Sequence, residues 1–132
     1  MQFSVILDTH TLEWPEFLRA YSSANSQGRV ALNIQRLIEA INHGDYRFAY
    51  TRLSGGFRQN NFTTLESFER SIRDTLPSRI RIEFGEFNRE GNVYTYEVRL
   101  FERDNHNAPP VRKTFIMQLQ DGTDFVYSFN II

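Results

Sequence analysis

The chain has 132 residues, of which 40% are hydrophobic and 14% aromatic, so it is long enough to close one hydrophobic core in a single domain. Its formal net charge of −1 excludes a global electrostatic attraction to nucleic acid or to an anionic membrane. The absence of cysteine excludes disulfides and thiolate chemistry. Twelve Phe and six Tyr against one Trp favour a core that includes a sheet, and so a mixed α and β class.

Residues 1–28 are predicted to form an extension of one strand and one helix before the main domain. Phe3–Leu7 is a short apolar run, which indicates a strand or an extended arm. Because this run is too short for the apolar core of a signal peptide or for a bilayer span, we expect no direct membrane insertion in this chain. Pro15–Ser22 is predicted as a helix, since Pro suits a first turn and Glu16 suits the positive end of the helix dipole.

From Arg29 the apolar residues repeat with the period of a helix that buries one face. Gly44 can adopt the left-handed conformation that ends such a helix. Asp45 then suits the N-cap of a second helix. The expected buried residues of the two helices are Val30, Ile34, Leu37, Ile38, Ile41, Tyr46, Ala49, Tyr50 and Leu53.

A third helix is predicted after Ser54-Gly55-Gly56, which breaks the second one. Thr63 and Glu66 have the spacing of a capping box, so this helix is expected to start at Thr63. Glu69 and Arg73 are an ion pair of the favoured orientation on its exposed side. Its buried stripe is expected to be Leu65, Phe68, Ile72 and Leu76.

The rest of the chain alternates as four strands in an antiparallel meander. In the first hairpin, charge favours the register that sets Glu83 opposite Arg99 over the one that sets Glu83 opposite Glu97. Asp121-Gly122 predicts a two-residue type I′ turn in the last hairpin. The residues expected to share strand faces are Ile80, Ile82 and Phe84, then Tyr94, Tyr96, Val98 and Leu100, then Phe115, Met117 and Leu119, and finally Phe125, Tyr127, Phe129 and Ile131.

The last two strands carry apolar side chains on both predicted faces. Phe115, Met117 and Val126 are expected on one face, and Ile116, Tyr127 and Phe129 on the other. A sheet with one solvent-exposed face does not show that pattern, so either both faces are covered by the protein or one of them contacts a partner.

This order of elements resembles the nuclear-transport-factor-2-like domains, which have the cystatin-like cone. The resemblance covers Arg29 to Ile132 and implies one compact domain, 29–132. It implies an α+β fold in which three N-terminal helices pack on a curved antiparallel sheet of about four main strands. It rests on Asn42-His43-Gly44-Asp45-Tyr46-Arg47-Phe48-Ala49-Tyr50, Leu53-Ser54, Phe57-Arg58, Phe62-Thr63, Leu65-Glu66-Ser67-Phe68, Phe115-Ile116-Met117 and Gly122-Thr123-Asp124-Phe125-Val126.

The chain is similar to the bacterial branch of that family, whose members are modules of anchored or secreted proteins. The resemblance therefore implies a module of a larger or membrane-associated bacterial protein, and favours a place outside the cytoplasm over one inside it. The residues that carry it are packing residues, so they indicate the fold more strongly than the function.

Enzymes of this fold, such as ketosteroid isomerase and scytalone dehydratase, hold an Asp or His base and a Tyr or carboxylic-acid donor inside the cone. Here Glu83 and Glu97 alternate out of phase with the apolar strand residues, so we expect them to face solvent and assign no catalytic residue. The candidate ligand-binding residues of the cone interior are Tyr46, Tyr50, Tyr94 and Tyr96.

No metal site or cofactor is expected, because His10, His43 and His106 are far apart in the sequence and each falls in a turn or loop. Basic residues gather on the predicted outer sheet face, but acidic residues among them neutralise their field, so nucleic acid is not an expected partner. These basic residues are Arg79, Arg81, Arg99, Arg103, Arg112 and Lys113.

The sequence leaves two candidate functions for this chain. The first is a non-catalytic binding or assembly module whose sheet face contacts a protein partner or a second copy, as in a homodimer, since exposed apolar area marks contact surfaces. The alternative is a small-molecule-binding or isomerase/dehydratase-like enzyme that uses the cone interior. An open interior with an inward acid favours the alternative, and a core filled by Phe side chains excludes it.

Overall fold

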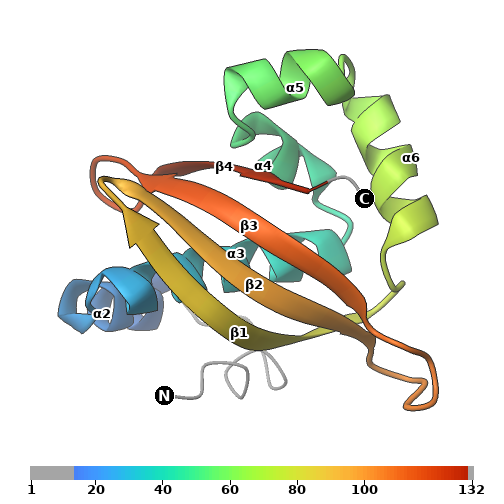
Figure 1. Ribbon diagram of the computed structural model, residues 1–132, viewed down its shortest axis with the longest axis horizontal. Helices are drawn as coiled ribbons and strands as arrows, with labels where there is room; N and C mark the ends of the chain where they lie inside the picture. The colour runs from blue at the N-terminus through green and yellow to red at the C-terminus, as the bar shows by residue number, and fades with distance from the viewer. Residues whose placement is uncertain (1–13, 131–132) are drawn as a thin grey trace.

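The computed structural model describes residues 14–130, so the predicted extended segment Phe3–Leu7 lies outside the described residues. Within residues 14–130, five helices precede a four-stranded antiparallel sheet, which confirms the α+β class (Figure 1). None of these described helices is both long and apolar enough to cross a membrane. The elements are α2 (Trp14–Ser23), α3 (Ser26–Asn42), α4 (Tyr46–Thr51), α5 (Gly55–Asn61), α6 (Leu65–Thr75), β1 (Ile80–Glu90), β2 (Val93–Glu102), β3 (Val111–Leu119) and β4 (Phe125–Phe129).

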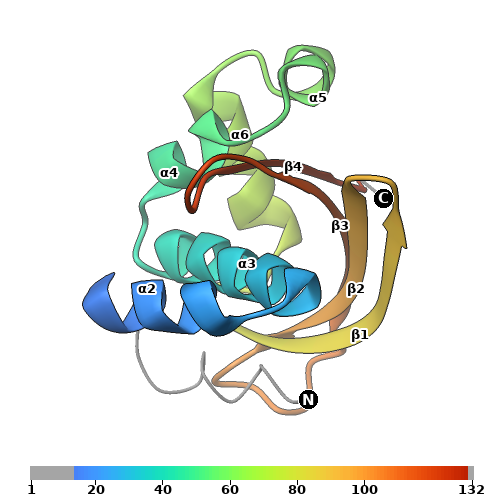
Figure 2. The ribbon, with the colours of Figure 1, turned by 90° about the vertical axis from the view of Figure 1, so that its left-hand side faces the viewer.

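α3 is the central helix, with the sheet on one side and α2 on the other (Figure 2). It begins at Ser26 and not at the predicted Arg29, because Asn25 caps it: the Gly28 amide donates to Asn25 Oδ1 at 2.9 Å. The predicted end is confirmed, since Gly44 has a φ of 79° just beyond it. The helix is buried along most of its circumference, and its fully buried apolar residues are Val30, Ala31, Ile34, Leu37 and Ile38.

α4 follows the corner as predicted, and Asp45 caps it by accepting from the Phe48 amide at 3.2 Å. The prediction of three helices is wrong, because the expected break at Gly55 and Gly56 is the first turn of α5. α5 forms despite these poor helix formers because it places the Phe57 ring against Phe129, with ring centroids 5.2 Å apart. Tertiary packing therefore overrides local propensity here.

The capping box of α6 is present, but the predicted residues are wrong by one position. The Ser67 amide donates to Thr64 Oγ1 at 3.1 Å, and the Thr64 amide donates to Ser67 Oγ at 3.3 Å. The helix therefore starts at Leu65, one residue later than a Thr63 cap would set it. The predicted Glu69–Arg73 ion pair is confirmed at 3.0 Å.

The strand order β1-β2-β3-β4 confirms the meander, and the predicted register of the first hairpin is also confirmed. Glu83 pairs with Arg99 across the strands, and Arg99 Nη2 donates to Glu83 Oε1 at 2.8 Å. A bulge between Phe84 and Phe87 lets this register coexist with a short turn at the hairpin end. Gly85 lies in the bulge, where an added Cβ would come 3.3 Å from the Glu97 carbonyl oxygen.

The last hairpin differs from the prediction in its turn and its faces. Leu119 pairs with Phe125, so residues 120–124 connect the strands where a two-residue turn was expected. The Gln120 amide donates to the Asp124 carbonyl at 2.8 Å, which closes this longer loop.

The longer loop changes which side chains share a face. Phe115 pairs with Phe129 and Met117 with Tyr127, and paired residues lie on the same face of a sheet. The predicted division of these side chains between two faces is therefore wrong. All the large rings of β3 and β4 lie on the inner face, toward the helices, and Ile116 and Val126 lie on the outer face.

We expect Thr64→Ala to lower the free energy of unfolding by about 1 kcal/mol, because it removes the side chain that satisfies the Ser67 amide. Thr63→Ala is the matched control, since Thr63 is exposed and outside the capping box, and its effect should be close to zero. Urea unfolding followed by circular dichroism measures both. An equal loss in the two variants would contradict the assignment of the cap.

Candidate functional site

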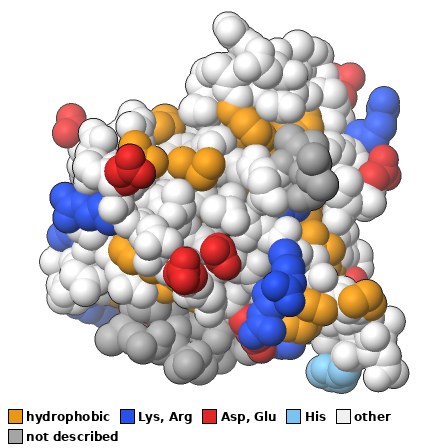
Figure 3. Space-filling model, in the orientation of Figure 1, with side chains coloured by type: hydrophobic (Ala, Val, Ile, Leu, Met, Phe, Trp, Pro, Cys, Tyr) orange, Lys and Arg blue, Asp and Glu red, His pale blue; other side chains and the backbone are white. Residues whose placement is uncertain are grey.

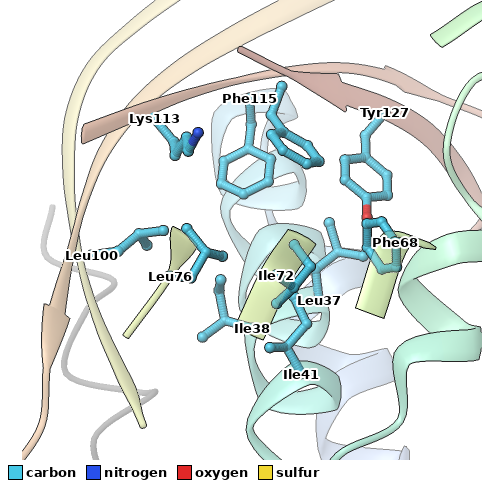
Figure 4. Close-up of a pocket in the computed structure, with 11 residues that line it drawn as sticks. Leu37, Ile38, Ile41, Phe68, Ile72, Leu76, Leu100, Lys113, Phe115 and Tyr127 are labelled. Carbon is cyan, nitrogen blue, oxygen red and sulfur yellow. The ribbon is translucent and has the colours of Figure 1, made fainter. Parts of the chain in front are cut away.

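The interior holds a small cavity between α3, α6 and the inner face of the sheet (Figure 4). Its volume is about 10 Å³, roughly the space that one water molecule needs. All its lining side chains are apolar except Lys113 and Tyr127. A cavity of this size and lining does not admit a substrate, and its lining holds no carboxylate or imidazole that could act as a general base.

Lys113 lies on the inner face of the sheet, so its predicted place in the outer basic group is wrong (Figure 4). It is 6% exposed, and its Nζ donates to the Asn130 carbonyl at 2.8 Å. The Nζ also lies 5.6 Å from the Phe129 ring centroid. Burial lowers the pKa of Lys113. Its position in β3 has the same parity as Phe115 and Met117, so the strand alternation did contain this signal.

Tyr127 connects the sheet to α4 from the other side of the cavity. Its hydroxyl donates to the Ala49 carbonyl at 2.8 Å, and burial raises the pKa of this phenol far above its ordinary value. Its backbone amide donates to the Arg52 carbonyl at 3.0 Å, and its carbonyl accepts from the Ser54 amide at 2.8 Å. These polar contacts give Tyr127 a packing role in which the phenol stays neutral.

The structure does not bring the four candidate tyrosines together. The Tyr94 hydroxyl is 3.3 Å from Ser26 Oγ, and the Tyr96 hydroxyl accepts from Gln27 Nε2 at 3.1 Å, both at the start of α3. The other two are on α4. The Tyr50 hydroxyl donates to the Phe62 carbonyl at 3.0 Å, and the Tyr46 ring lies 5.5 Å from the Arg73 guanidinium. None of the four lines the cavity, and their role in ligand binding stays a prediction.

The acids of the first hairpin lie away from this cavity. Glu97 is exposed, while Glu83 accepts from Arg99 at 2.8 Å and from Arg81 at 3.0 Å. Arg81 and Arg99 also flank the Phe101 ring, with guanidinium carbons 4.4 Å and 5.8 Å from its centroid. The outer face of the sheet is therefore ionic, and Figure 3 shows acidic and basic side chains mixed on the side of the molecule that carries it.

The outer face also contains one large exposed apolar side chain, Ile116, which is 40% exposed. On the same face, Arg99 pairs directly with Arg112 across β2 and β3. Two like charges in paired positions repel each other. Arg99 already donates to Glu83, so Arg112 is the member of the pair that has no ion pair within residues 14–130. Glu97 lies two residues from Arg99 on β2 and forms no ion pair within residues 14–130.

A second polar group lies on the opposite side of α3, and the sequence did not predict it. We call it the arginine–aromatic corner, and its members come from α2, α3, α4 and its C-cap, the β3–β4 connection and β4. Arg52 lies four residues after Phe48, but Arg36 and the rings of α2 come from other helices, so spacing along the chain does not reveal that the whole group meets. The corner comprises Trp14, Phe17, Arg36, Phe48, Arg52, Asp124 and Phe125.

Comparisons with known proteins do not identify the chain: no family model, no curated protein and no solved structure matches it. The resemblance to nuclear-transport-factor-2-like domains therefore stays a prediction. What the chain does must be argued from its own interior and surface.

We expect Tyr127→Phe to lower the free energy of unfolding by about 1–3 kcal/mol, because the buried Ala49 carbonyl loses its partner. The difference between wild type and variant should be constant below a pH of about 10 and shrink above it. The sign follows from the raised pKa: above pH 10 the unfolded phenol ionises while the folded phenol keeps its proton, so wild type loses stability.

Urea unfolding between neutral pH and pH 11 measures this difference, with Tyr46→Phe as the control. Tyr46 is a partly buried tyrosine of α4, and its substitution leaves the hydrogen bond from Tyr127 to the Ala49 carbonyl in place. A pH-independent difference for Tyr127→Phe would contradict the buried position of its phenol.

Proposed function

We propose that this chain is a non-catalytic assembly module that binds a second copy of itself through the outer face of its sheet. The observation that carries the proposal is the outer face of the sheet, where Ile116 is exposed on the same face as the paired cations Arg99 and Arg112. The cavity between α3, α6 and the sheet, at about 10 Å³, has no room for a substrate. The cone shape, the relation to nuclear-transport-factor-2-like domains and a place in an extracytoplasmic or membrane-associated bacterial protein belong to the same proposal.

Charge complementarity favours a second copy as the occupant of the outer face. A two-fold contact places the same patch of both molecules together, so a residue away from the axis meets a different residue of the partner, and a residue at the axis meets its own copy. Arg99 and Arg112 are adjacent cations on this face, and Glu97 is an exposed acid beside them. In a two-fold contact each Arg pair can meet the Glu97 of the other copy while Ile116 packs at the centre.

The alternative, a small-molecule binder or isomerase-like enzyme, needs room in the interior and an acid pointing into it. The cavity and its lining supply neither of these. The amine that lines the cavity belongs to Lys113, and it donates a hydrogen bond to the Asn130 carbonyl. We therefore keep self-association as the single proposed function.

We expect sedimentation velocity to find a dimer of the wild-type chain at micromolar concentration. Ile116→Lys should weaken it by at least about tenfold, because a lysine ammonium would have to be desolvated at the centre of the contact. Leu18→Lys is the matched control, since Leu18 is 38% exposed but lies on α2, away from the sheet.

Charge reversal provides the sharper test of the pairing. Glu97→Arg and Arg112→Glu should each weaken the dimer, and the double variant should recover most of the affinity because the charges are complementary again. A wild-type chain that stays monomeric across this concentration range would contradict the proposal. So would a dimer that neither Ile116→Lys nor the charge reversals affect.

A further inference from the structure

We propose that Arg36 and Arg52, beside the exposed ring of Trp14, bind the carboxylate of an acidic peptide segment that carries an aromatic or aliphatic side chain next to the acid. The corner is separate from the outer sheet face, so peptide binding at this site does not depend on self-association. Figure 2 shows the connection between β3 and β4 lying beside α4 and over α3, on the side where α2 also packs.

The two guanidinium groups share one aromatic ring. The Arg52 guanidinium carbon lies 3.9 Å from the Phe48 ring centroid, and that of Arg36 lies 5.1 Å from the same centroid. Arg36 also lies 4.7 Å from the Phe17 centroid and 5.5 Å from that of Trp14. A contact with an aromatic ring does not give a guanidinium N–H group an oxygen acceptor, so the N–H groups without other partners remain available to an anion.

Within residues 14–130, few of these N–H groups have acceptors. Arg36 Nη1 donates to Asn33 Oδ1 and to the Thr123 carbonyl, each at 3.3 Å, and Arg52 Nη1 donates to the Phe48 carbonyl at 3.4 Å. Arg52 Nε is buried and has no hydrogen-bond partner within residues 14–130. A carboxylate from solution can meet the exposed part of the Arg52 side chain, which is 26% exposed, and it supplies two acceptor oxygens in the geometry that guanidinium groups match.

The local charge also favours an anion. Burial and then the nearby charge of Arg52 lower the pKa of Arg36, while Asp124 acts in the opposite direction. Asp124 is the one acid paired with Arg52 in the described chain; its Oδ1 lies 3.7 Å from Arg52 Nη2, and its side chain is 67% exposed. Two partly desolvated cations thus face one solvated carboxylate, and a second carboxylate would relieve their repulsion.

Trp14 gives the site a preference for more than a simple anion. Its ring stacks on Phe17 with centroids 5.4 Å apart, yet the residue is 52% exposed. A large aromatic ring that is fixed on one side and open on the other offers apolar contact beside the guanidinium groups. Inorganic phosphate cannot use that ring, whereas a peptide with an apolar side chain next to its acid can.

Trp14 is the only tryptophan of the chain, so its fluorescence reports directly on this site. The probe is the acetylated and amidated tripeptide Phe-Glu-Phe, compared with Phe-Gln-Phe and with inorganic phosphate alone. We expect a saturable change of emission with Phe-Glu-Phe, and affinities at least about tenfold weaker for the other two, since each lacks either the charge or the apolar side chains.

Arg36→Gln and Arg52→Gln should each weaken binding of Phe-Glu-Phe by at least about tenfold. Arg58→Gln is the matched control, because Arg58 is also partly buried and lies 5.5 Å from a ring centroid, that of Tyr50, outside the corner. Asp124→Asn should tighten binding several-fold by removing the competing carboxylate, a gain that a misfolded variant cannot produce.

The proposal is overturned if wild type shows no saturable change with Phe-Glu-Phe. It is also overturned if Phe-Gln-Phe or phosphate binds as tightly, or if the arginine variants bind as wild type does. An unchanged titration of Asp124→Asn would also overturn it, because that result would mean that the two arginines only hold the β3–β4 connection in place. Sedimentation of the same variants separates the two proposals, because changes at the corner should leave the dimer intact.

Discussion

The fold depends on the need to bury α3 on nearly every side. Its buried residues, such as Leu32 and Ile34, lie on opposite sides of the helix, so no single layer can cover them. The sheet covers one side, and Phe17 and Tyr21 of α2 pack against Leu32 on another. The remaining helices and β4 close the end of the core, where the cavity between α3, α6 and the sheet measures about 10 Å³.

The sequence predicted the parts of the fold that depend on local signals. The cap at Asp45 and the helix end at Gly44 depend on a few neighbouring residues, and the strand alternation has a fixed period. The pairing of Glu83 with Arg99 was predictable because opposite charges favour one register over its neighbour. Each of these features can be evaluated before the rest of the chain is placed.

The sequence could not predict features that depend on distant contacts. α5 forms because Phe57 meets Phe129, which lies in the last strand. The candidate site shows the same limit: Arg36 and Arg52 converge on Phe48 only once α3, α4 and β4 are in place. Lys113 is different, because its inward position follows from the strand period and conflicts only with the general preference of lysine for solvent.

The hydrogen bonds between Tyr127 and the connection from α4 to α5 also determine how the sheet can meet another molecule. They occupy the outer edge of β4, where Leu53 forms an isolated parallel bridge to Tyr127. The opposite edge is β1, where the bulge at Gly85 interrupts a straight row of backbone donors. Neither edge offers a long, regular template for strand addition, so open-ended fibres built edge to edge are disfavoured and face-to-face contact remains.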